Sequence, residues 1–452
     1  MENGKIRTKL LATLGPATSS YEVIRSMIQE GADAFRINFS HGSHEEAGQL
    51  IGLTRKAEAD TGNSVPIIAD LQGPTVRLGE FKQFDVVKGK RYEVSEGGEI
   101  PLDSDVFYRL VEVGDTVIID GGRLWARVEG KSGNTVFISF IVEGELGSKK
   151  TVAIQGKEYP LNSPTEKDLD DLKFAARAGM DGVAMSFVKT SEDIEKLRSV
   201  MADLGSGMFI VAKIETISAV NNITGIIGAT DYVLVARGDL GSHFPMVKIP
   251  ELERNIIRQS MNYGKPAIVA TQLLDSMINN PIPTRAEITD VFMAVSMGAD
   301  ALMVSGETAV GRYPIEVIKW LRDIAKEGEL YSRARPKVEG LDVYDKFAEG
   351  VANLGELIGG RLVAMTSTGK TPQRLARFRP KCDIIAVCQD QRIAKKIQLT
   401  WGVKPVIIQQ EKNEQAIIDK LKSMSLIATG DKIVMTRSLR QGVTDAIRII
   451  EV

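Results

Sequence analysis

Val211-Ala-Lys-Ile-Glu215 and Val235-Ala-Arg-Gly-Asp-Leu240 each join an apolar run, typical of a strand, to an abrupt group of charges. A strand that is buried on both faces carries a continuous apolar run, so charges at its end must face an opening rather than packed side chains. In parallel α/β proteins, ligands bind at the carboxyl ends of the strands. These two runs therefore predict a ligand site on a parallel sheet.

Six further apolar runs share this pattern, and each of the eight is followed by a segment with helical periodicity. The predicted strands are 8–13, 32–37, 66–69, 182–185, 209–212, 231–236, 266–270 and 300–304. Segments 20–29, 165–178 and 284–296 are examples of the predicted helices. Thr165 with Asp168 and Thr284 with Glu287 have capping-box spacing. Eight βα units predict an α/β fold, a closed (β/α)8 TIM barrel formed by residues 1–77 and 162–333.

The ends of these strands supply a set of polar side chains that would meet on one rim. They are Thr13, Arg36, Asn38, Asp70, Ser186, Lys213, Glu215, Arg237, Asp239, Thr271, Gln272, Ser305 and Glu307. Any one of them could cap a helix or pair at the surface. Taken together they match an active site, because catalytic residues of such barrels come from several strands at the carboxyl end.

The 452 residues exceed a barrel of about 250 residues and leave room for two more domains. Residues 78–161 show short alternating runs at 91–95, 116–119, 124–128 and 135–141, with glycine turns between them. We expect a small β-barrel here, inserted as a lid domain. After a linker at 333–336, residues 334–452 show four strand patterns, at 361–366, 383–387, 404–408 and 432–436, and a helical one at 413–422. These predict a C-terminal open α/β domain with a regulatory or interface role.

Composition excludes several classes of function. With 57 basic and 59 acidic residues, the balance argues against general binding to nucleic acid or to a membrane surface. Cys382 and Cys388 have no metal-ligand histidine nearby, so neither a disulfide framework nor a zinc site is predicted. With no membrane-spanning stretch and no signal-peptide pattern, we expect a cytoplasmic protein.

The rim residues favour chemistry on an anionic substrate. Only three histidines are present, which disfavours a serine-histidine-carboxylate hydrolase. Glu215 and Asp239 come from adjacent strands and suit a hard divalent cation such as Mg²⁺ or Mn²⁺. Lys213, Arg36 and Arg237 would add positive charge beside that metal. A phosphate-bearing substrate is the simplest match.

Nine motifs, in this order along the chain, carry a family resemblance. They are Ala12-Thr-Leu-Gly-Pro-Ala-Thr18, Phe35-Arg-Ile-Asn-Phe-Ser-His-Gly42, Asp70-Leu-Gln-Gly-Pro74, Thr165-Glu-Lys-Asp168, Ala212-Lys-Ile-Glu215, Val235-Ala-Arg-Gly-Asp-Leu-Gly241, Ala270-Thr-Gln272, Pro283-Thr-Arg-Ala-Glu287 and Ser305-Gly-Glu-Thr-Ala309. Through them the chain resembles pyruvate kinase over nearly its full length. The resemblance implies a glycolytic enzyme that moves a phosphoryl group from phosphoenolpyruvate to ADP, giving pyruvate and ATP.

The resemblance also assigns catalytic roles. Lys213 would stabilise the transferring phosphoryl group, Arg36 would hold its oxygens, and Glu215 with Asp239 would bind Mg²⁺. Further contacts to the substrate are implied for Ser186, Gly238, Asp239 and Thr271. A proton for the enolate carbon would pass from Thr271 through water with Ser305 and Glu307. The alternative is that the Thr271 hydroxyl only makes a hydrogen bond within the rim, since a threonine is a poor acid.

Nucleotide and monovalent-cation sites are implied in the same way. Contacts to ADP or ATP are implied for Asn38, His41, Arg77 and Lys150, although Lys150 has the alternative role of a solvated hinge lysine. Ligands for K⁺ are implied at Asn38, Ser40, Asp70 and the Leu71 carbonyl. Thr75 departs from the pattern, because relatives that require potassium carry glutamate there and independent relatives often carry lysine. We therefore expect no potassium requirement. His243 likewise replaces an expected acidic residue.

The loop Thr366-Ser-Thr-Gly-Lys-Thr371 precedes a predicted helix and could hold a phosphate through Thr366, Ser367, Thr368, Gly369, Lys370 and Thr371. It is not a P-loop, because Ala364 stands where that motif requires glycine. Family members bind phosphorylated effectors at an equivalent loop, so a sugar phosphate or nucleotide activator is implied. A solvated basic helix face is the alternative. A homotetramer is also implied by the resemblance.

Two other readings of the rim remain open. One is a Mg²⁺-dependent lyase or mutase that handles pyruvate enolates without a nucleotide. The other is a non-catalytic sensor that keeps the pocket to bind a metabolite. Dependence on ADP discriminates the first, and ligand binding without turnover would indicate the second.

Overall fold

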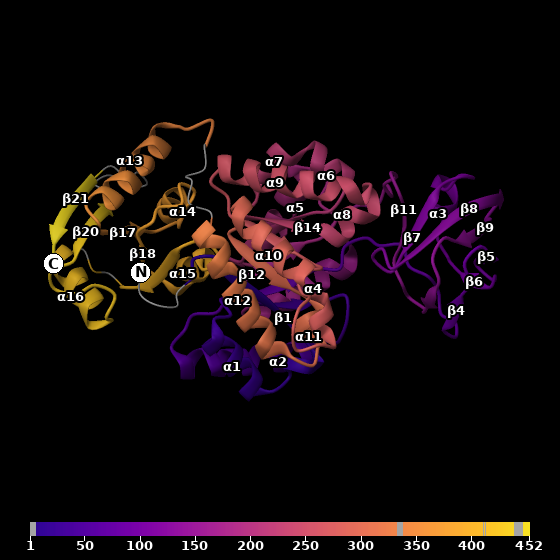
Figure 1. Cartoon of the computed structure of the whole chain (residues 1–452), viewed down its shortest axis with the longest axis horizontal. Coiled ribbons are helices and arrows are strands. Elements are labelled where there is room, and N and C mark those ends of the chain that lie inside the picture. Colours follow the sequence, from indigo (N-terminus) through magenta and orange to yellow (C-terminus); the bar gives the residue numbers. More distant parts are fainter. Residues whose placement is uncertain (1–5, 332–337, 410, 412, 438–445) are drawn as a thin grey trace.

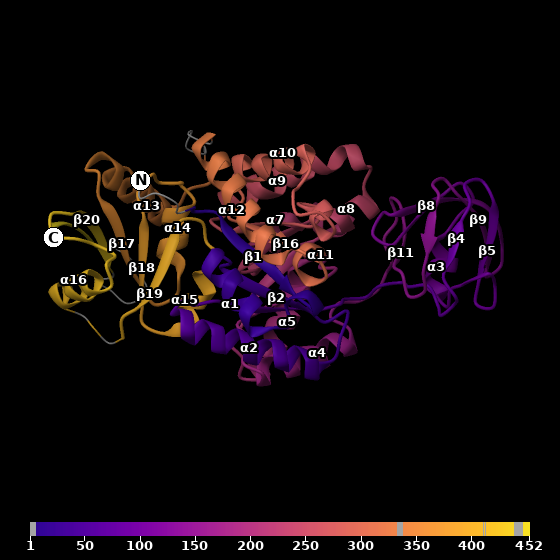
Figure 2. The same ribbon diagram turned by 60° about the horizontal axis from the view of Figure 1, so that its bottom comes forward.

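The computed structural model describes residues 6–331, 338–409, 411, 413–437 and 446–452. Three domains lie in a row, with the barrel between the C-terminal domain and the inserted β domain (Figure 1). The order is the same after rotation (Figure 2). The two smaller domains therefore meet opposite ends of the barrel.

The central domain is a closed barrel of eight parallel strands, which confirms the predicted fold. The strands are β1 (Lys9–Leu14), β2 (Ala34–Asn38), β3 (Ile67–Asp70), β12 (Gly182–Met185), β13 (Phe209–Ile214), β14 (Tyr232–Ala236), β15 (Ala267–Ala270) and β16 (Ala301–Val304). Around the barrel they follow the order β1, β16, β15, β14, β13, β12, β3, β2. Most strand residues are buried, which accounts for their continuous apolar runs.

Helices surround the barrel, both on its outside and at its rim. They are α1 (Tyr21–Glu30), α2 (His44–Thr61), α4 (Glu166–Arg177), α5 (Ser191–Asp203), α6 (Ile217–Asn221), α7 (Ile223–Ala229), α8 (Arg237–His243), α9 (Ile249–Asn262), α10 (Arg285–Met297), α11 (Gly306–Ala309) and α12 (Pro314–Tyr331). Both predicted capping boxes are present, at Thr165 before α4 and Thr284 before α10. In each, a hydroxyl accepts a free amide of the first turn, which fixes where the helix begins. Within the described ranges, no helix combines the length and the apolar character that crossing a bilayer requires.

A small β domain with its own core is inserted between β3 and β12. Its elements are β4 (Phe84–Val86), β5 (Arg91–Ser95), β6 (Ile100–Pro101), α3 (Asp105–Leu110), β7 (Thr116–Ile119), β8 (Leu124–Ser132), β9 (Thr135–Phe140), β10 (Gly144–Leu146) and β11 (Val152–Ile154). The four predicted strands are confirmed as β5, β7, β8 and β9. Six strands form one sheet and β4 pairs with β10 in a second, around one apolar cluster that includes Tyr92, Phe107 and Phe140.

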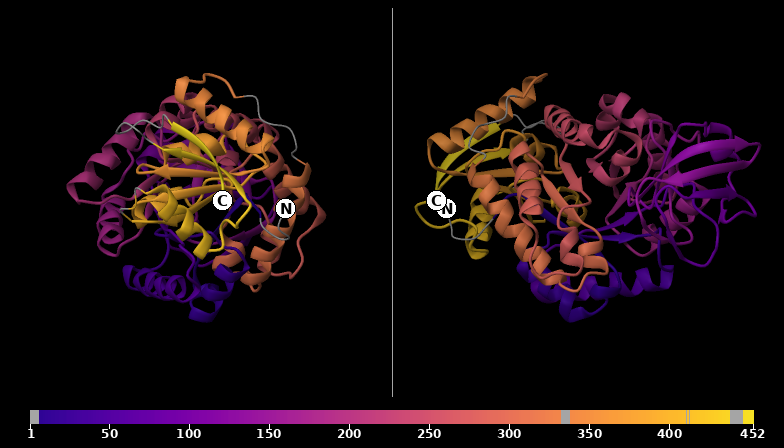
Figure 3. Two further views of the ribbon diagram at one scale, coloured as in Figure 1. Left: turned by 90° about the vertical axis from the view of Figure 1, so that its left-hand side faces the viewer. Right: turned by 45° about the vertical axis from the view of Figure 1, so that its right-hand side comes forward.

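The C-terminal domain is an open five-stranded sheet, in the order β19, β18, β17, β20, β21. Its elements are α13 (Val343–Leu357), β17 (Arg361–Thr366), α14 (Lys370–Ala376), β18 (Ile384–Cys388), α15 (Gln391–Ile397), β19 (Val403–Ile407), α16 (Glu414–Ser423), β20 (Lys432–Arg437) and β21 (Ala446–Glu451). The four predicted strands are confirmed, and β21 adds an antiparallel edge. The left panel of Figure 3 shows this sheet in front of the barrel. The linker predicted at 333–336 lies outside the described residues.

Candidate active site

Lys213 lies on β13 at the centre of the polar rim. Its ammonium nitrogen is 2.6 Å from Ser186 Oγ, 3.4 Å from Asp70 Oδ1 and 3.5 Å from Glu215 Oε2. Burial alone would lower the pKa of Lys213, but the carboxylates of Asp70, Glu215 and Asp239 outweigh it and raise the pKa above its usual range. The site therefore holds a permanent cation among side chains from three neighbouring strands.

Glu215 follows β13 and is fully buried. Its Oε1 accepts the amide of Phe187 at 2.5 Å, whereas Oε2 has no hydrogen-bond partner. Burial raises the pKa of Glu215 to about 8, with a further increase from Asp239 and opposition from Lys213. A buried carboxylate oxygen without a partner is costly unless it takes a proton or a cation. Glu215 is therefore suited to bind a cation in exchange for a proton.

Asp70 ends β3 and orients Arg36 of β2. The Nε of Arg36 donates to Asp70 Oδ2 at 2.5 Å, and Nη1 donates to Thr13 Oγ1 at 3.0 Å. Burial opposes ionisation of Asp70, but Arg36 and Lys213 hold its pKa below the usual range. The remaining guanidinium nitrogen, Nη2, has no hydrogen-bond partner among the described residues. Arg36 is thus fixed with one nitrogen left for a ligand.

Thr271 and Gln272, directly after β15, have φ angles of 70° and 55°, which are unusual for residues with a side chain. The Thr271 hydroxyl accepts the amide of Gly238 at 2.9 Å. Arg237 donates to the carbonyls of Thr271 and Gln272 at 2.7 and 3.1 Å. These hydrogen bonds stabilise the strained turn and offset the energetic cost of its positive φ angles.

Arg237 does not face the anion pocket as predicted. Its side chain is only 7% exposed, and its guanidinium forms ion pairs with Asp290 at 2.8 Å and Glu253 at 3.5 Å. The prediction missed this because those carboxylates lie on α9 and α10, far from the strand end in sequence. Arg237 therefore supports the turn after β15 and is not available to the substrate.

Asp239 lies in the first turn of α8, beside the centre of the site. It is close enough to Lys213 and Glu215 to raise the pKa of both. No group of three or more His, Cys, Asp or Glu in the described part of the chain is arranged to hold a metal. Two carboxylates still suit Mg²⁺, because this ion usually keeps water and substrate oxygens as its other ligands. The Oε2 of Glu215, which makes no hydrogen bond, also fits this role.

The predicted nucleotide contacts form a positively charged group beside Arg36. Burial lowers the pKa of His41, and Arg77, Arg36 and Lys150 lower it further, which places these side chains near one another. Arg77 is also within electrostatic reach of Asp239. Lys150 is partly exposed and forms an ion pair with Asp120 at 3.1 Å. In this conformation Lys150 is therefore held by the inserted domain.

The inserted domain is joined to the barrel by two chain segments that lie side by side. Leu78 donates its amide to the Lys150 carbonyl, and Val152 donates to the Val76 carbonyl, both at 2.9 Å. The second segment is fastened to α8 by His243, whose Nδ1 lies 3.2 Å from the Lys157 carbonyl. His243 is buried and its pKa is lowered by that burial. The residue that replaces an expected acid thus anchors a domain connection.

The implied potassium ligands lie together at the ends of β2 and β3. Asn38 pairs with Asp70 across the two strands, and its Oδ1 accepts the amide of Ser40 at 3.0 Å. The Leu71 carbonyl already accepts the Ser186 hydroxyl at 2.7 Å. Thr75 carries no charge, and its hydroxyl accepts a hydrogen bond from Arg77 Nε at 3.0 Å.

Ser305 and Glu307 lie beyond β16, where Glu307 has a clear structural task. Its fully buried carboxylate accepts the amides of Ser305 at 2.7 Å and Leu274 at 3.2 Å. Burial raises its pKa. Among the described residues no direct hydrogen bond joins Thr271 to Ser305 or Glu307, so a relay between them requires water.

The loop 366–371 connects β17 to α14, as predicted. Ser367, Thr368 and Lys370 are exposed on it, and Thr366 Oγ1 accepts the Gly369 amide at 2.8 Å. A cavity of about 820 Å³ lies beside this loop. Four arginines near this loop are already engaged by carboxylates. Arg361, Arg374, Arg377 and Arg379 all form ion pairs with aspartates.

The sequence analysis did not predict the contacts that two residues make to the site. Thr13 was placed on the rim but not as the anchor of Arg36, and the amide of Phe187 was not foreseen as a ligand of Glu215. Phe187 has a φ of 56°, which directs its amide toward Glu215. No local sequence pattern marks such a residue, because its conformation is imposed by neighbouring strands.

Family models describe most of the chain. "Pyruvate kinase, barrel domain" matches residues 5–318, and "Pyruvate kinase, alpha/beta domain" matches residues 353–450. Together with the rim of charged strand ends on a closed barrel, they define a phosphotransferase. The chain belongs to the pyruvate kinase family.

Individual relatives agree over nearly the full length. A pyruvate kinase of Pyrobaculum aerophilum is 35% identical over 96% of this chain and 95% of its own. One of Clostridium acetobutylicum is 34% identical over 99% of both chains. A crystal structure of pyruvate kinase from Pyrobaculum aerophilum superposes with a TM-score of 0.87 and 32% identity, covering 99% of each chain. The family implies phosphoenolpyruvate and ADP as substrates and a divalent metal as cofactor.

Proposed function

We propose that the rim of this barrel transfers the phosphoryl group of phosphoenolpyruvate to ADP by neutralising charge around a fixed Lys213. The observation that carries the proposal is the buried ammonium of Lys213 between Asp70 and Glu215. In the reaction, the bond between phosphorus and the enol oxygen breaks and a bond from phosphorus to the terminal oxygen of ADP forms. The enolate carbon then takes up one proton. A loose phosphoryl transfer needs positioning and electrostatic stabilisation rather than covalent catalysis.

Lys213 and Arg36 would bind the transferring phosphoryl group. Lys213 keeps its proton because three carboxylates surround it, and Ser186 fixes its position at 2.6 Å. Arg36 is held by Asp70 and Thr13, and its Nη2 makes no hydrogen bond among the described residues. Ser186, Gly238, Asp239 and Thr271 would complete the contacts to the substrate.

Glu215 and Asp239 would hold Mg²⁺ or Mn²⁺. When bound, the ion supplies positive charge to substrate oxygens. The chain's own contribution is a buried carboxylate oriented by the Phe187 amide, with one oxygen that makes no hydrogen bond and lies 3.5 Å from the Lys213 ammonium. This arrangement supports the metal assignment independently of turnover.

The nucleotide would lie over Asn38, His41, Arg77 and Lys150. Arg77 and Lys150 are on the two connections of the inserted domain, so a movement of that domain would carry both over the phosphates. Closure would exclude water and limit hydrolysis. Lys150 must then exchange Asp120 for phosphate.

Thr271 is the proposed donor of the proton, through water with Ser305 and Glu307. Its hydroxyl oxygen accepts from Gly238, so its own hydrogen is free to be donated. Solvent-isotope incorporation into pyruvate should fall in Thr271→Ser less than in Thr271→Ala. Equal incorporation in the parent and both variants would leave Thr271 with only a hydrogen-bonding role in the rim.

The test of the main proposal compares Lys213→Met with Lys173→Met, a control on the outer face of α4. Pyruvate formation is measured from phosphoenolpyruvate and Mg²⁺, with and without ADP and without potassium. Loss of the central cation should lower kcat by at least about a hundredfold, since one electrostatic donor is worth about that much. The control should match the parent. A Lys213→Met enzyme with parental turnover would remove the proposal.

The same assay addresses the other readings. Pyruvate formation or carbon-carbon cleavage without ADP would favour the lyase or mutase, and substrate binding without turnover would favour a sensor. Activity without potassium would support the role given to uncharged Thr75. A large stimulation by K⁺ at constant ionic strength would instead support the ligand set Asn38, Ser40, Asp70 and Leu71.

Regulation and assembly form a separate part of the proposal. The exposed side chains of Ser367, Thr368 and Lys370 would bind a phosphorylated effector. The enzyme would act in glycolysis in the cytoplasm and would assemble as a homotetramer. Lys370→Ala should reduce activation by phosphate esters and leave basal activity unchanged. A monomer mass from light scattering would contradict the tetramer.

A further inference from the structure

Four aspartates form a ring at the end of the barrel opposite the active site. Asp33, Asp181, Asp231 and Asp300 directly precede β2, β12, β14 and β16, which are every second strand around the barrel. Each carboxylate accepts an amide from the barrel strand that comes before it along the chain. The accepted amides are those of Leu10, Ile67, Ile210 and Ala267, at 2.8 to 3.0 Å.

The second carboxylate oxygen of each aspartate faces the C-terminal domain. Asp181 is 3.3 Å from Lys395, Asp231 is 2.7 Å from Lys396, and Asp300 is 2.9 Å from Arg379. Asp33 lies 3.5 Å from the Gln398 amide. The C-terminal domain thus contacts all four aspartates through residues 379–398.

The chain directly after these residues closes the barrel. Leu399 is fully buried in one apolar cluster with inward-facing strand residues such as Leu11 and Phe209. The Tyr232 hydroxyl donates to the Lys396 carbonyl at 2.6 Å. Because these contacts lie inside the aspartate ring, the C-terminal domain is packed into the barrel end and not merely against its outer helices.

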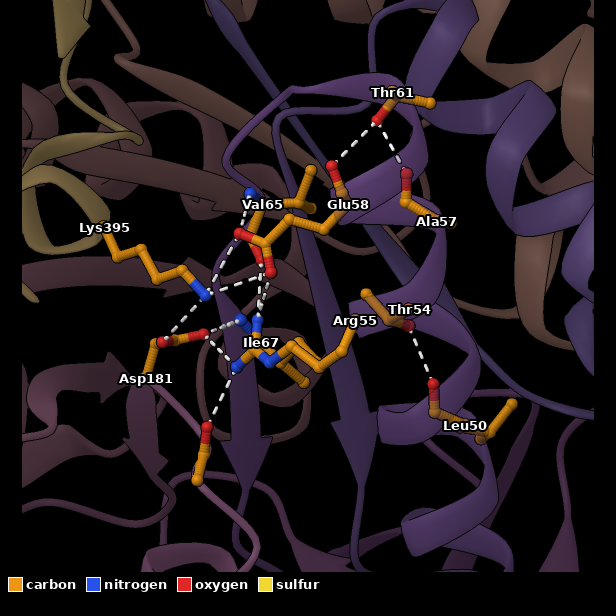
Figure 4. Close-up of polar contacts among 11 residues, drawn as sticks. Leu50, Thr54, Arg55, Ala57, Glu58, Thr61, Val65, Ile67, Asp181 and Lys395 are labelled. Carbon is orange, nitrogen blue, oxygen red and sulfur yellow. Dashed lines mark hydrogen bonds and ion pairs between the residues drawn. The ribbon is translucent and has the colours of Figure 1, made fainter. Parts of the chain in front are cut away.

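Lys395 makes the most buried of these polar contacts, with only 6% of its side chain exposed. Its ammonium lies between Glu58 at 3.1 Å and Asp181 at 3.3 Å, and Arg55 bridges the same two carboxylates (Figure 4). Glu58 and Arg55 are on α2, whereas Asp181 leads into β12. One lysine of the C-terminal domain therefore joins a barrel helix to a barrel strand.

The strands that carry the aspartates also carry much of the rim. Arg36 lies three residues after Asp33, and Ser186 lies five residues after Asp181. Asp239 follows Asp231, and Ser305 follows Asp300, along β14 and β16. A short strand in a close-packed barrel shifts as a unit, so a displacement at one end is transmitted to the other.

We propose that Lys395, Lys396 and Arg379 are positioning residues, through which the C-terminal domain sets the placement of alternate barrel strands and hence of the active-site rim. Lys395 acts through Asp181 and β12 on Ser186, which holds Lys213. Lys396 acts through Asp231 and β14 on Asp239. The second of these paths rests on the proposed metal role of Asp239.

The experiment compares Lys395→Met and Lys396→Met with Arg361→Met in the full-length enzyme. Arg361 is a partly buried cation whose aspartate partners, Asp383 and Asp431, lie within the C-terminal domain, so it is a matched control. Misplacement of catalytic groups by a fraction of an ångström costs about five- to fiftyfold in kcat. Lys395→Met should lose that much kcat with little change in the Mg²⁺ requirement. Lys396→Met should mainly raise the Mg²⁺ concentration for half-maximal activity.

Hydrogen exchange provides a readout that does not depend on turnover. Peptides covering 182–189 should exchange faster in Lys395→Met, and peptides covering 232–241 should do so in Lys396→Met. Lys395→Arg should restore both kcat and exchange. If Lys395→Met does not fold, Lys396→Met, whose lysine is 29% exposed, carries the test.

Parental kcat and exchange in both lysine variants would overturn the inference. Equal losses in Arg361→Met would also overturn it, because they would indicate general destabilisation. Neither result would affect the proposed function, whose own test is Lys213→Met.

Discussion

Binding of Mg²⁺ to the free enzyme at pH 7 should release close to one proton, and the proton should come from Glu215. Burial raises the pKa of this carboxyl to about 8 in the metal-free protein. At pH 7 such a group is about nine-tenths protonated, and it must ionise to bind a cation. The neighbouring Lys213 keeps its proton, because its pKa is raised, and Asp70 is already ionised, because its pKa is lowered.

The size of the pH dependence of Mg²⁺ binding follows from the pKa of Glu215. The apparent affinity for Mg²⁺ should weaken about fivefold between pH 8 and pH 7, and about tenfold, or about 1.4 kcal/mol, between pH 7 and pH 6. Above pH 9 both the proton release and the pH dependence should vanish. A raised carboxyl pKa also means that the metal-free protein loses stability as pH rises from the ordinary value of 4.5 through about 8.

Calorimetric titration with Mg²⁺ in two buffers of different ionisation enthalpy measures the released proton directly. Glu215→Gln is the matched control, since it keeps the shape but has no proton to release, and it should bind weakly without pH dependence. No proton release at pH 7 by the parent, or an affinity unchanged from pH 6 to 9, would refute the reasoning.

Three further predictions concern residues outside the metal pair. Arg237→Gln should reduce kcat at least about tenfold by loosening the turn after β15, while leaving ADP affinity unchanged, which steady-state kinetics would show. Gly73→Ala should destabilise the enzyme by about 1–3 kcal/mol, because φ is 68° and a Cβ would lie 2.8 Å from Ser186; a parental midpoint in urea would contradict this. Burial raises the pKa of the Cys382 thiol to about 11 and that of Cys388 to about 12, so both should react with Ellman's reagent at pH 8 only after unfolding, and rapid labelling of the native enzyme would show otherwise.

The sequence was sufficient to predict the barrel and most of its rim, because strands buried on both faces carry an unmistakable apolar signal. Lys213, Glu215 and Asp70 were located by the same signal, since a charge at the end of such a strand must face the site. Asp70 and Glu215 do both lie within 3.5 Å of the Lys213 ammonium. For these three residues, the position at the end of an apolar strand was enough to locate them in the site.

The sequence was not sufficient where a side chain's partner is distant along the chain. Arg237 has the same pattern as Lys213 but turns toward α9 and α10, where Glu253 and Asp290 neutralise it. The aspartate ring was missed for a similar reason. Gly31-Ala-Asp33, Gly179-Met-Asp181 and Gly298-Ala-Asp300 repeat a Gly-x-Asp pattern before alternate strands. That repeat marks the strand entries, but it does not reveal the C-terminal lysines and arginine that bind them.

The charge of the rim depends on the protonation of Glu215. In the metal-free protein, Arg36 and Lys213 pair with ionised Asp70, Arg77 lies within electrostatic reach of Asp239, and Glu215 is mostly protonated. Arrival of a divalent ion adds two charges and removes one proton, so the site becomes more positive by one unit. An anionic substrate is then attracted more strongly than before, because Coulomb interactions are amplified in a partly buried site. Because the pKa of Glu215 is raised, metal binding at pH 7 increases the charge of the rim by one unit instead of two, and this increase, which couples metal binding to substrate binding, depends on pH.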